Sequence, residues 1–315
     1  MNYIGIDIGG TNLKAGLVDD RGTVLATKKV KIAQINNADA LAWAMVSMTQ
    51  ELAEAVNVSF DQIASVGVGV PGTVEIHSGS LLYTCNLPLR NVPLRRLFHR
   101  YLRIPLYIEN DANCAALGEA YAGCGNGAKD FVAITLGTGV GSGIIVDGKI
   151  VTGANNAGGE CGHMVIVVDG EPCTCGRHGC WEAYASATAL IRQTKAAMDA
   201  NPTSVMHDLA KEEGKVSGRT AFDAMRRGDI AGIKVVEQYI KYVACGIINL
   251  VNALQPEVLC VGGGICAEGE TLLRPLRRYI EAERYSIYSK IQTKIVRAEL
   301  GNDAGVIGAA LLGRV

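Results

Sequence analysis

One arrangement occurs twice along the chain and limits its fold more than any other feature: a short apolar strand, a glycine-rich loop, a second strand, a turn and a third strand. The first copy covers residues 3–29 and contains the loop Gly9-Gly10-Thr11-Asn12. The second covers residues 131–152 and contains the loop Gly137–Gly143. Short β-branched runs separated by turn residues predict hairpins. The repeated pattern predicts two units of similar architecture.

The other apolar patterns predict helices between buried strands. We expect the helices at 37–56, 111–121, 234–254 and 304–312, and the buried strands at 63–70 and 257–261. A length of 315 residues is comfortable for two domains. The sequence therefore predicts an α/β protein with an N-terminal domain over residues 1–115, completed by residues 301–315, and a larger C-terminal domain over residues 116–300. Clefts between such domains hold ligands.

Composition and charge exclude several classes of protein. Apolar residues make up 49% of the chain, so a disordered protein is excluded. The 30 basic and 31 acidic residues leave no basic excess for a nucleic-acid backbone or an anionic membrane. Asp7 and the glycine pair interrupt the only apolar start, so no signal peptide is expected. No stretch reaches the ~20 apolar residues of a membrane span. We expect a cytoplasmic protein with reduced thiols.

The glycine-rich loops are candidates for holding phosphate, because glycine lets the backbone N–H groups approach an anion closely. A plain tight hairpin is the alternative for each loop taken alone. Asp7 lies at a strand end, where it could hold Mg²⁺ through water, and Gly262-Gly263-Gly264 could approach the adenine and ribose of a nucleotide. The candidate nucleotide residues are Asp7, Gly9, Gly10, Thr11, Asn12, Lys14, Gly137, Thr138, Gly139, Gly141, Gly263 and Gly264.

Two further segments carry chemistry. Asp111 follows an apolar strand and opens an alanine-rich helix, where a carboxylate can take a proton from an attacking hydroxyl or simply cap the helix. Cys173, Cys175 and Cys180 lie within eight residues and can bind one tetrahedral zinc ion together with a histidine. His163 and His178 are both candidates for that fourth ligand. Four protein ligands leave no open position, so the zinc is expected to be structural.

Taken together, the Asp7–Lys14 segment, the Gly137–Gly143 loop and the cysteine cluster resemble the ROK family of sugar kinases, within the actin-like ATPase fold. The resemblance extends to the final Asn302-Asp303-Ala304-Gly305 segment. It implies two actin-like (ribonuclease H-like) ATPase domains with an interdomain cleft and a zinc-binding loop. The implied activity is ATP- and Mg²⁺-dependent phosphorylation of a hexose at its 6-hydroxyl, as in a glucokinase of glycolysis. It also implies a homodimer or homotetramer.

The resemblance assigns roles to individual residues. Asp111 matches the catalytic base of the family and Asn110 its sugar-binding amide. Glu160 and Glu182 match carboxylates that bind sugar hydroxyls. His163 matches the zinc ligand, and its second ring nitrogen also binds the sugar. Gly72 matches a glycine that lies against the sugar.

Two departures from the family pattern leave the identity of the sugar open. Thr73 stands where many family glucokinases have a proline, and Leu89-Arg90 replaces the usual continuation of Asn86-Leu87-Pro88. N-acetylmannosamine, N-acetylglucosamine, allose and fructose are therefore alternatives to glucose. A different class of function is a sugar-sensing ROK repressor that lacks catalysis. Such repressors carry a DNA-binding segment before the first loop, for which Asp7 leaves no room, so the expected partner is a small-molecule sugar.

Overall fold

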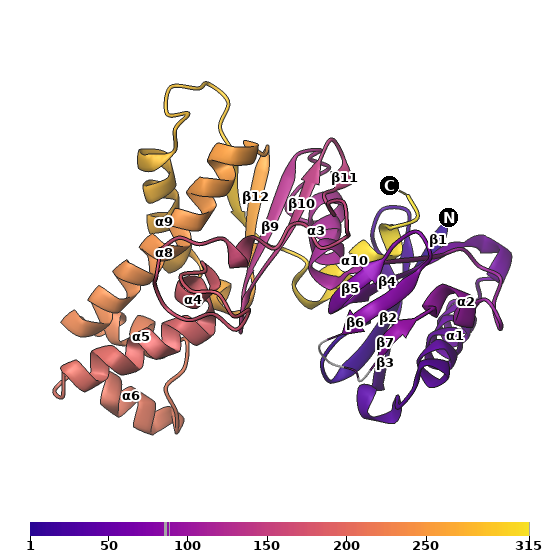
Figure 1. The fold of residues 1–315 in the computed structure, drawn as a ribbon, viewed down its shortest axis with the longest axis horizontal. Coiled ribbons are helices and arrows are strands. Elements are labelled where there is room, and N and C mark those ends of the chain that lie inside the picture. Colours follow the sequence, from indigo (N-terminus) through magenta and orange to yellow (C-terminus); the bar gives the residue numbers. More distant parts are fainter. Residues whose placement is uncertain (85–86, 88, 315) are drawn as a thin grey trace. The chain divides into compact units, whose positions relative to one another are not determined.

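The computed structural model describes residues 1–84, 87 and 89–314, so Cys85, Asn86 and Pro88 lie outside the described residues (Figure 1). The chain divides into two compact units. Unit 1 contains residues 1–133, 143–159 and 298–315, and unit 2 contains residues 134–142 and 160–297. The predicted domain boundaries after residues 115 and 300 remain a prediction.

Unit 1 contains a five-stranded sheet whose central strands are buried. Its order is β3-β2-β1-β4-β8. Strands β1, β2 and β3 form an antiparallel meander, and β4 and β8 continue the sheet parallel to β1. The strands are β1 (Asn2–Ile8), β2 (Asn12–Asp19), β3 (Val24–Lys31), β4 (Ile63–Val70) and β8 (Leu106–Asn110). The predicted hairpin meander and the buried strand at 63–70 are confirmed.

The two faces of this sheet receive different residues from each strand. Along β1, Ile4, Ile6 and Ile8 belong to the apolar core that contains residues of α1 (Ala38–Ala55). Gly5 faces α10 (Ala304–Leu311) on the other side, because a Cβ built on it would lie 1.8 Å from the Val306 carbonyl oxygen. Alternation of side chains along a strand produces this division.

Helices α3 (Asp111–Ala122) and α10 approach each other and the sheet at glycines. A Cβ built on Gly118 would lie 2.4 Å from the Ala304 oxygen, and one built on Gly308 would lie 1.6 Å from the Cys114 oxygen. A Cβ built on Gly67 of β4 would lie 1.7 Å from the Ala309 backbone oxygen. Part of the glycine content therefore serves backbone packing, which the sequence did not reveal.

Several elements of unit 1 were not predicted. They include a small sheet of order β5-β6-β7, which leads into a short helix. These elements are β5 (Gly72–Glu75), β6 (Ser80–Thr84), β7 (Arg90–Val92), α2 (Leu94–Phe98), η1 (Ile32–Gln34), η2 (Phe60–Gln62) and η5 (Gly301–Asp303).

The second five-stranded sheet repeats the strand order of the first. Its order is β11-β10-β9-β12-β13. When the strands of each sheet are numbered from 1 to 5 along the chain, both sheets have the order 3-2-1-4-5. The strands are β9 (Phe131–Leu136), β10 (Val140–Val146), β11 (Lys149–Ile150), β12 (Val258–Gly262) and β13 (Lys294–Arg297). The predicted internal repeat is confirmed as architecture. The predicted loop at 137–143 was too long, because β10 begins at Val140.

Unit 2 is mainly helical, and its longest helix is α8 (Ile230–Leu254). This helix begins four residues before the predicted start because Asp229 caps it, accepting a hydrogen bond from the Gly232 N–H at 2.7 Å. The other helices are α4 (Glu182–Ala185), α5 (Ala187–Ala200), α6 (Met206–Glu213), α7 (Thr220–Arg226), α9 (Glu270–Glu283), η3 (Cys161–His163) and η4 (Gly264–Glu268). Across the described part of the chain, no helix has the length and apolar character needed to cross a membrane.

Candidate functional site

Carboxylates gather at the carboxyl ends of two strands in unit 1. Asp7 of β1, Gly69 of β4 and Glu109 of β8 are successive partners in the sheet, so their side-chain positions share one face. Burial, followed by the neighbouring Asp111, raises the pKa of Asp7 to about 6, and Lys14 partly opposes this rise. Two acidic groups this close repel each other when both are ionised, so the site favours a bound cation.

Asp111 opens α3, but it is not the cap of that helix. The N-cap is Asn110, whose Oδ1 accepts hydrogen bonds from the N–H groups of Ala112 at 2.9 Å and Asn113 at 3.2 Å. The Asp111 Oδ1 accepts a hydrogen bond from the Ala112 N–H at 2.9 Å. Burial raises the pKa of Asp111 above its ordinary value. A half-buried carboxylate with a raised pKa can accept a proton from a bound hydroxyl.

The structure brings Gly72 and Asn110, two of the predicted sugar residues, together. The Asn110 Nδ2 donates to the Gly72 carbonyl oxygen at 3.4 Å. Gly72 has a φ of +151°, and a Cβ there would lie 2.1 Å from the Tyr83 oxygen. Only glycine fits this position.

Glu109 is a residue of this site that sequence reasoning missed. Its side chain is buried, and its Oε1 accepts hydrogen bonds from the Asn110 N–H at 2.8 Å and the Asn113 Nδ2 at 3.0 Å. Burial raises its pKa as well. Glu109 therefore holds the start of α3, and its place directly before Asn110 at the end of an apolar strand was the available signal.

The first predicted phosphate loop is an exposed hairpin end. Gly10, Thr11 and Asn12 are exposed, and the Gly9 N–H donates to the Asn12 oxygen at 3.0 Å. Lys14 is paired with Asp7 across the hairpin. The Lys14 Nζ donates to the Asn302 oxygen at 2.6 Å and also to the Asp303 carboxylate, so the lysine is tied to the C-terminal segment.

The predicted nucleotide loops of unit 2 lie beside one another. Gly263 has a φ of +86°, and a Cβ on it would lie 2.5 Å from the oxygen of Leu136, the residue before Gly137. Apart from the adjacent residues in the chain, no atom of the described residues lies within 4 Å of a Cβ built on Gly137 or Gly264, so the backbone is open there. The Gly137 and Thr138 carbonyls accept bonds from the first turn of α5, each at 2.8 Å. Gly141 lies inside β10 rather than in the loop.

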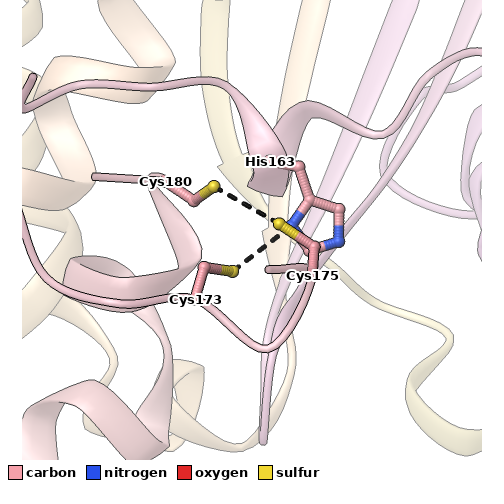
Figure 2. A group of neighbouring side chains, drawn as sticks. All are labelled: His163, Cys173, Cys175 and Cys180. Atoms are coloured by element: carbon pink, nitrogen blue, oxygen red, sulfur yellow. Dashed lines mark hydrogen bonds between the residues drawn. The ribbon is translucent and has the colours of Figure 1, made fainter. Parts of the chain in front are cut away.

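The four predicted metal ligands converge (Figure 2). Donor atoms of His163, Cys173, Cys175 and Cys180 all lie within 4.8 Å of one another. Cys173 Sγ lies 3.6 Å from His163 Nδ1, and Cys175 Sγ lies 3.7 Å from Cys180 Sγ. A tetrahedral zinc ion with Zn–S bonds of ~2.3 Å places its sulfurs about 3.8 Å apart, so the set fits zinc. His178 is exposed and does not belong to this group.

The thiols of this cluster have unequal acidity. Burial, followed by the neighbouring Cys175 and Cys173, raises the pKa of Cys180 to about 12. The Arg177 backbone N–H lowers the pKa of the exposed Cys175. A divalent cation would stabilise both as thiolates.

The carboxylates next to the metal group differ in their contacts. Glu182 Oε2 accepts a hydrogen bond from the Val140 N–H at 2.9 Å, and Oε1 accepts one from the Thr174 hydroxyl at 3.2 Å. Glu182 therefore joins the cysteine loop to the end of the Gly137–Gly139 loop. Glu160 is exposed, and its carbonyl oxygen accepts from the His163 N–H at 3.1 Å.

Comparisons with known proteins agree on one family. The ROK family model matches residues 3–314. A glucokinase of Halalkalibacterium halodurans is 34% identical over 98% of this chain and 94% of its own. The crystal structure of a Streptomyces griseus ROK glucokinase with glucose and AMPPNP superposes with a TM-score of 0.77 at 33% identity, covering 100% of this chain and 99% of that one. A xylose repressor of Caldicellulosiruptor bescii is 29% identical over 98% of this chain and 76% of its own. The chain belongs to the ROK family.

Proposed function

We propose that this chain is an ATP-dependent hexokinase that transfers the γ-phosphoryl group of ATP to the 6-hydroxyl of a hexose, with glucose as the preferred sugar. The observation that carries the proposal is the half-buried Asp111 beside Asn110 and Asp7. Full-length similarity to curated glucokinases supports it. This activity would place the protein in glycolysis.

Asp111 is the proposed general base. It takes the proton of the 6-hydroxyl as that oxygen attacks the γ-phosphorus, and Asn110 orients the sugar from the adjacent position. Burial favours the protonated form of Asp111, so the group readily accepts this proton. Positioning and charge neutralisation supply most of the rate in phosphoryl transfer.

Asp7 is the proposed residue for Mg²⁺. Burial and then the nearby Asp111 raise the pKa of Asp7, and a cation held by Asp7 would offset both effects. Magnesium, when bound, neutralises charge on the β- and γ-phosphates. The nucleotide itself is proposed to contact the backbone of Gly9–Thr11, Gly137–Gly139 and Gly263–Gly264. The matching order of the two five-stranded sheets supports two actin-like domains.

The proposed zinc ion is structural and braces the sugar-binding residues. His163, Cys173, Cys175 and Cys180 would hold it, which fixes the segment that carries Glu160 and Glu182. Charged acceptors discriminate sugars well, because an analogue that lacks a hydroxyl leaves a carboxylate unpaired. N-acetylhexosamines, allose and fructose remain the alternative sugars. A homodimer or homotetramer remains the expected assembly.

The test is ADP release measured over a panel of these sugars with the purified protein. We expect glucose to give the highest kcat/KM, and Asp111→Asn to lower kcat for glucose by about 10²- to 10⁴-fold. Asp61→Asn is the matched control, because Asp61 is also an aspartate in the first turn of a helix but is exposed. Asp111→Asn with normal turnover would remove the base assignment. Sugar-dependent DNA binding without ADP release would favour the repressor instead.

A further inference from the structure

The nucleotide loop at the end of β12 continues directly into the short helix η4. The Cys266 N–H donates to the Gly263 oxygen at 3.1 Å, and the Cys266 Sγ donates to the Gly262 oxygen at 3.3 Å. These bonds make Gly262–Gly264 and η4 one continuous turn. Any contact that fixes the far end of η4 therefore also fixes the position of Gly263 and Gly264.

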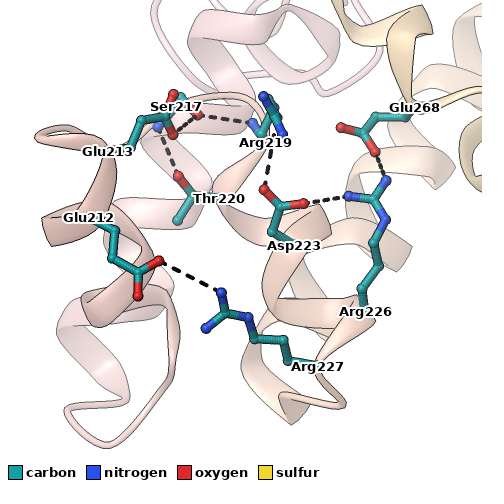
Figure 3. Close-up of polar contacts among 9 residues, drawn as sticks. All are labelled: Glu212, Glu213, Ser217, Arg219, Thr220, Asp223, Arg226, Arg227 and Glu268. Carbon is teal, nitrogen blue, oxygen red and sulfur yellow. Dashed lines mark hydrogen bonds and ion pairs between the residues drawn. The ribbon is translucent and has the colours of Figure 1, made fainter.

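The far end of η4 is held by an ion pair (Figure 3). The Arg226 guanidinium of α7 binds the Glu268 carboxylate, and its other nitrogen donates to Asp223 at 2.6 Å. The Glu268 side chain is only 7% exposed, against 44% for Arg226. A carboxylate so far removed from water needs its cationic partner.

A second contact joins the same two parts of unit 2. A Cβ built on Gly218 would lie 2.9 Å from the Ile265 Cδ1, and Ile265 is buried. The loop before α7 therefore packs closely on the start of η4, while Arg226 holds its end. The ion pairs of the two flanking arginines do not reach η4: Arg219, directly before α7, pairs with Asp223 at 3.9 Å, and Arg227, directly after α7, pairs with Glu212 of α6 at 3.7 Å.

We propose that the Arg226–Glu268 ion pair is a latch that fastens η4 to α7 and so positions Gly263 and Gly264 for the nucleoside of ATP. The inference rests on the proposed function, because that function places the nucleotide against Gly263 and Gly264, where the sequence predicts contact with adenine and ribose. Both residues are positioning residues and touch neither sugar nor phosphate. Loss of either leaves the end of η4 free to shift, so nucleoside binding weakens while sugar binding does not.

The test compares Arg226→Gln and Glu268→Gln with wild type by calorimetric titration and steady-state kinetics. We expect each variant to raise the Kd of ATP and of AMP by about five- to tenfold. The Kd of inorganic tripolyphosphate, which reaches only the phosphate loops, and the KM of the sugar should stay constant. The double variant should be no weaker than either single variant, because both remove one interaction.

The control is Arg227→Gln at the next position along the chain, which removes an exposed ion pair to Glu212 of α6 that does not reach η4. Its ATP Kd should equal that of wild type. Equal losses for Arg226→Gln and Arg227→Gln, or a parallel rise in sugar KM or tripolyphosphate Kd, would overturn the latch. If Arg226→Gln does not fold, Arg226→Lys keeps the charge without the planar fork. An unchanged ATP Kd in that variant overturns the latch, and a smaller rise confined to ATP and AMP supports it.

The proposed function and the latch fail separately. Wild-type protein that phosphorylates no sugar would refute the proposed activity. Nucleotide titration of the same samples would still decide whether Arg226 and Glu268 act on the nucleoside.

Discussion

Asp7 and Asp111 form a site whose negative charges destabilise the folded protein. Both carboxylates are partly buried, and burial followed by the nearby Asp111 raises the pKa of Asp7. Ionising both without a cation is unfavourable, yet binding of magnesium and transfer of a proton need them ionised. The sequence indicated both residues. It left open whether Asp111 acts as a base or simply caps α3, and the extended backbone of Asn110 shows that Asn110 is the cap.

We expect Asp7→Asn to stabilise the protein at neutral pH in the absence of magnesium and nucleotide. The pKa of Asp7 rises from 3.8 to about 6 on folding, so the native state binds this proton more tightly than the unfolded state. The contribution of Asp7 to stability therefore falls as the pH rises from about 4 to about 6, and it stays low above that range. The variant should gain about 1–2 kcal/mol in free energy of unfolding at pH 7.5, and much less at pH 4.5.

Urea unfolding at the two pH values measures this difference. Asp61→Asn, at an exposed position, should change stability equally little at both. A gain for Asp7→Asn that is the same at pH 4.5 and pH 7.5 would show that titration of Asp7 is not its cause.

At the scale of elements, the cysteine loop could be predicted because its ligands are close in sequence, whereas the contacts of that loop could not. Trp181, directly after Cys180, packs on Gly246 of α8, and its Nε1 donates to the Tyr242 oxygen at 2.8 Å. This contact joins residues about 60 positions apart, and no local pattern indicates it. The start of β10 at Val140 was not predicted, because glycines at 141 and 143 suggest a loop. Backbone pairing in a sheet is nevertheless compatible with glycine.

Cys175→Ser should remove the metal without damaging a packed core, because Cys175 is exposed. We expect one zinc per chain in wild type and almost none in the variant, with a lower melting temperature. The KM for sugar should rise by about tenfold or more, because Glu182 and His163 lose their support. Zinc content by elemental analysis is the primary measurement.

Cys124→Ser is the matched control, since Cys124 lies outside the metal group. It should keep its zinc and its sugar KM. Full zinc content in Cys175→Ser would mean that the four residues do not form the metal site.

At the scale of the whole molecule, the order of elements followed from the sequence more readily than the distances between them. Repeated strand-loop-strand patterns predicted two similar sheets, and both sheets have the same order. The close approach of α10 to α3 and to β1 and β4 was not predictable, because it depends on Gly5, Gly67, Gly118 and Gly308, which are scattered along the chain. A single glycine inside a helix or strand gives no indication of the backbone that will pack against it.

Gly308→Ala tests this close packing, because the higher helix propensity of alanine and the steric overlap of its Cβ change stability in opposite directions. Alanine favours a helix by about 1 kcal/mol over glycine, so an exposed helical site would gain stability. At Gly308 the new Cβ would lie 1.6 Å from the Cys114 backbone oxygen, which cannot turn aside as a side chain can. The helices must separate, and we expect a net loss of about 3 kcal/mol in urea unfolding.

Gly214→Ala separates this packing effect from the general effect of replacing a glycine. Gly214 ends α6 with a φ of +75°, and within the described part of the chain only its sequence neighbours come within 4 Å of a built Cβ. Backbone strain alone should reduce the stability of this variant by about 1 kcal/mol. Because a Cβ on Gly305, near the start of α10, would lie 3.2 Å from Asp7 Oδ2, the displaced helix in Gly308→Ala should also disturb Asp7 and lower kcat, whereas Gly214→Ala should not. If Gly308→Ala is as stable and as active as Gly214→Ala, the packing of α10 against α3 and beside Asp7 does not depend on this glycine.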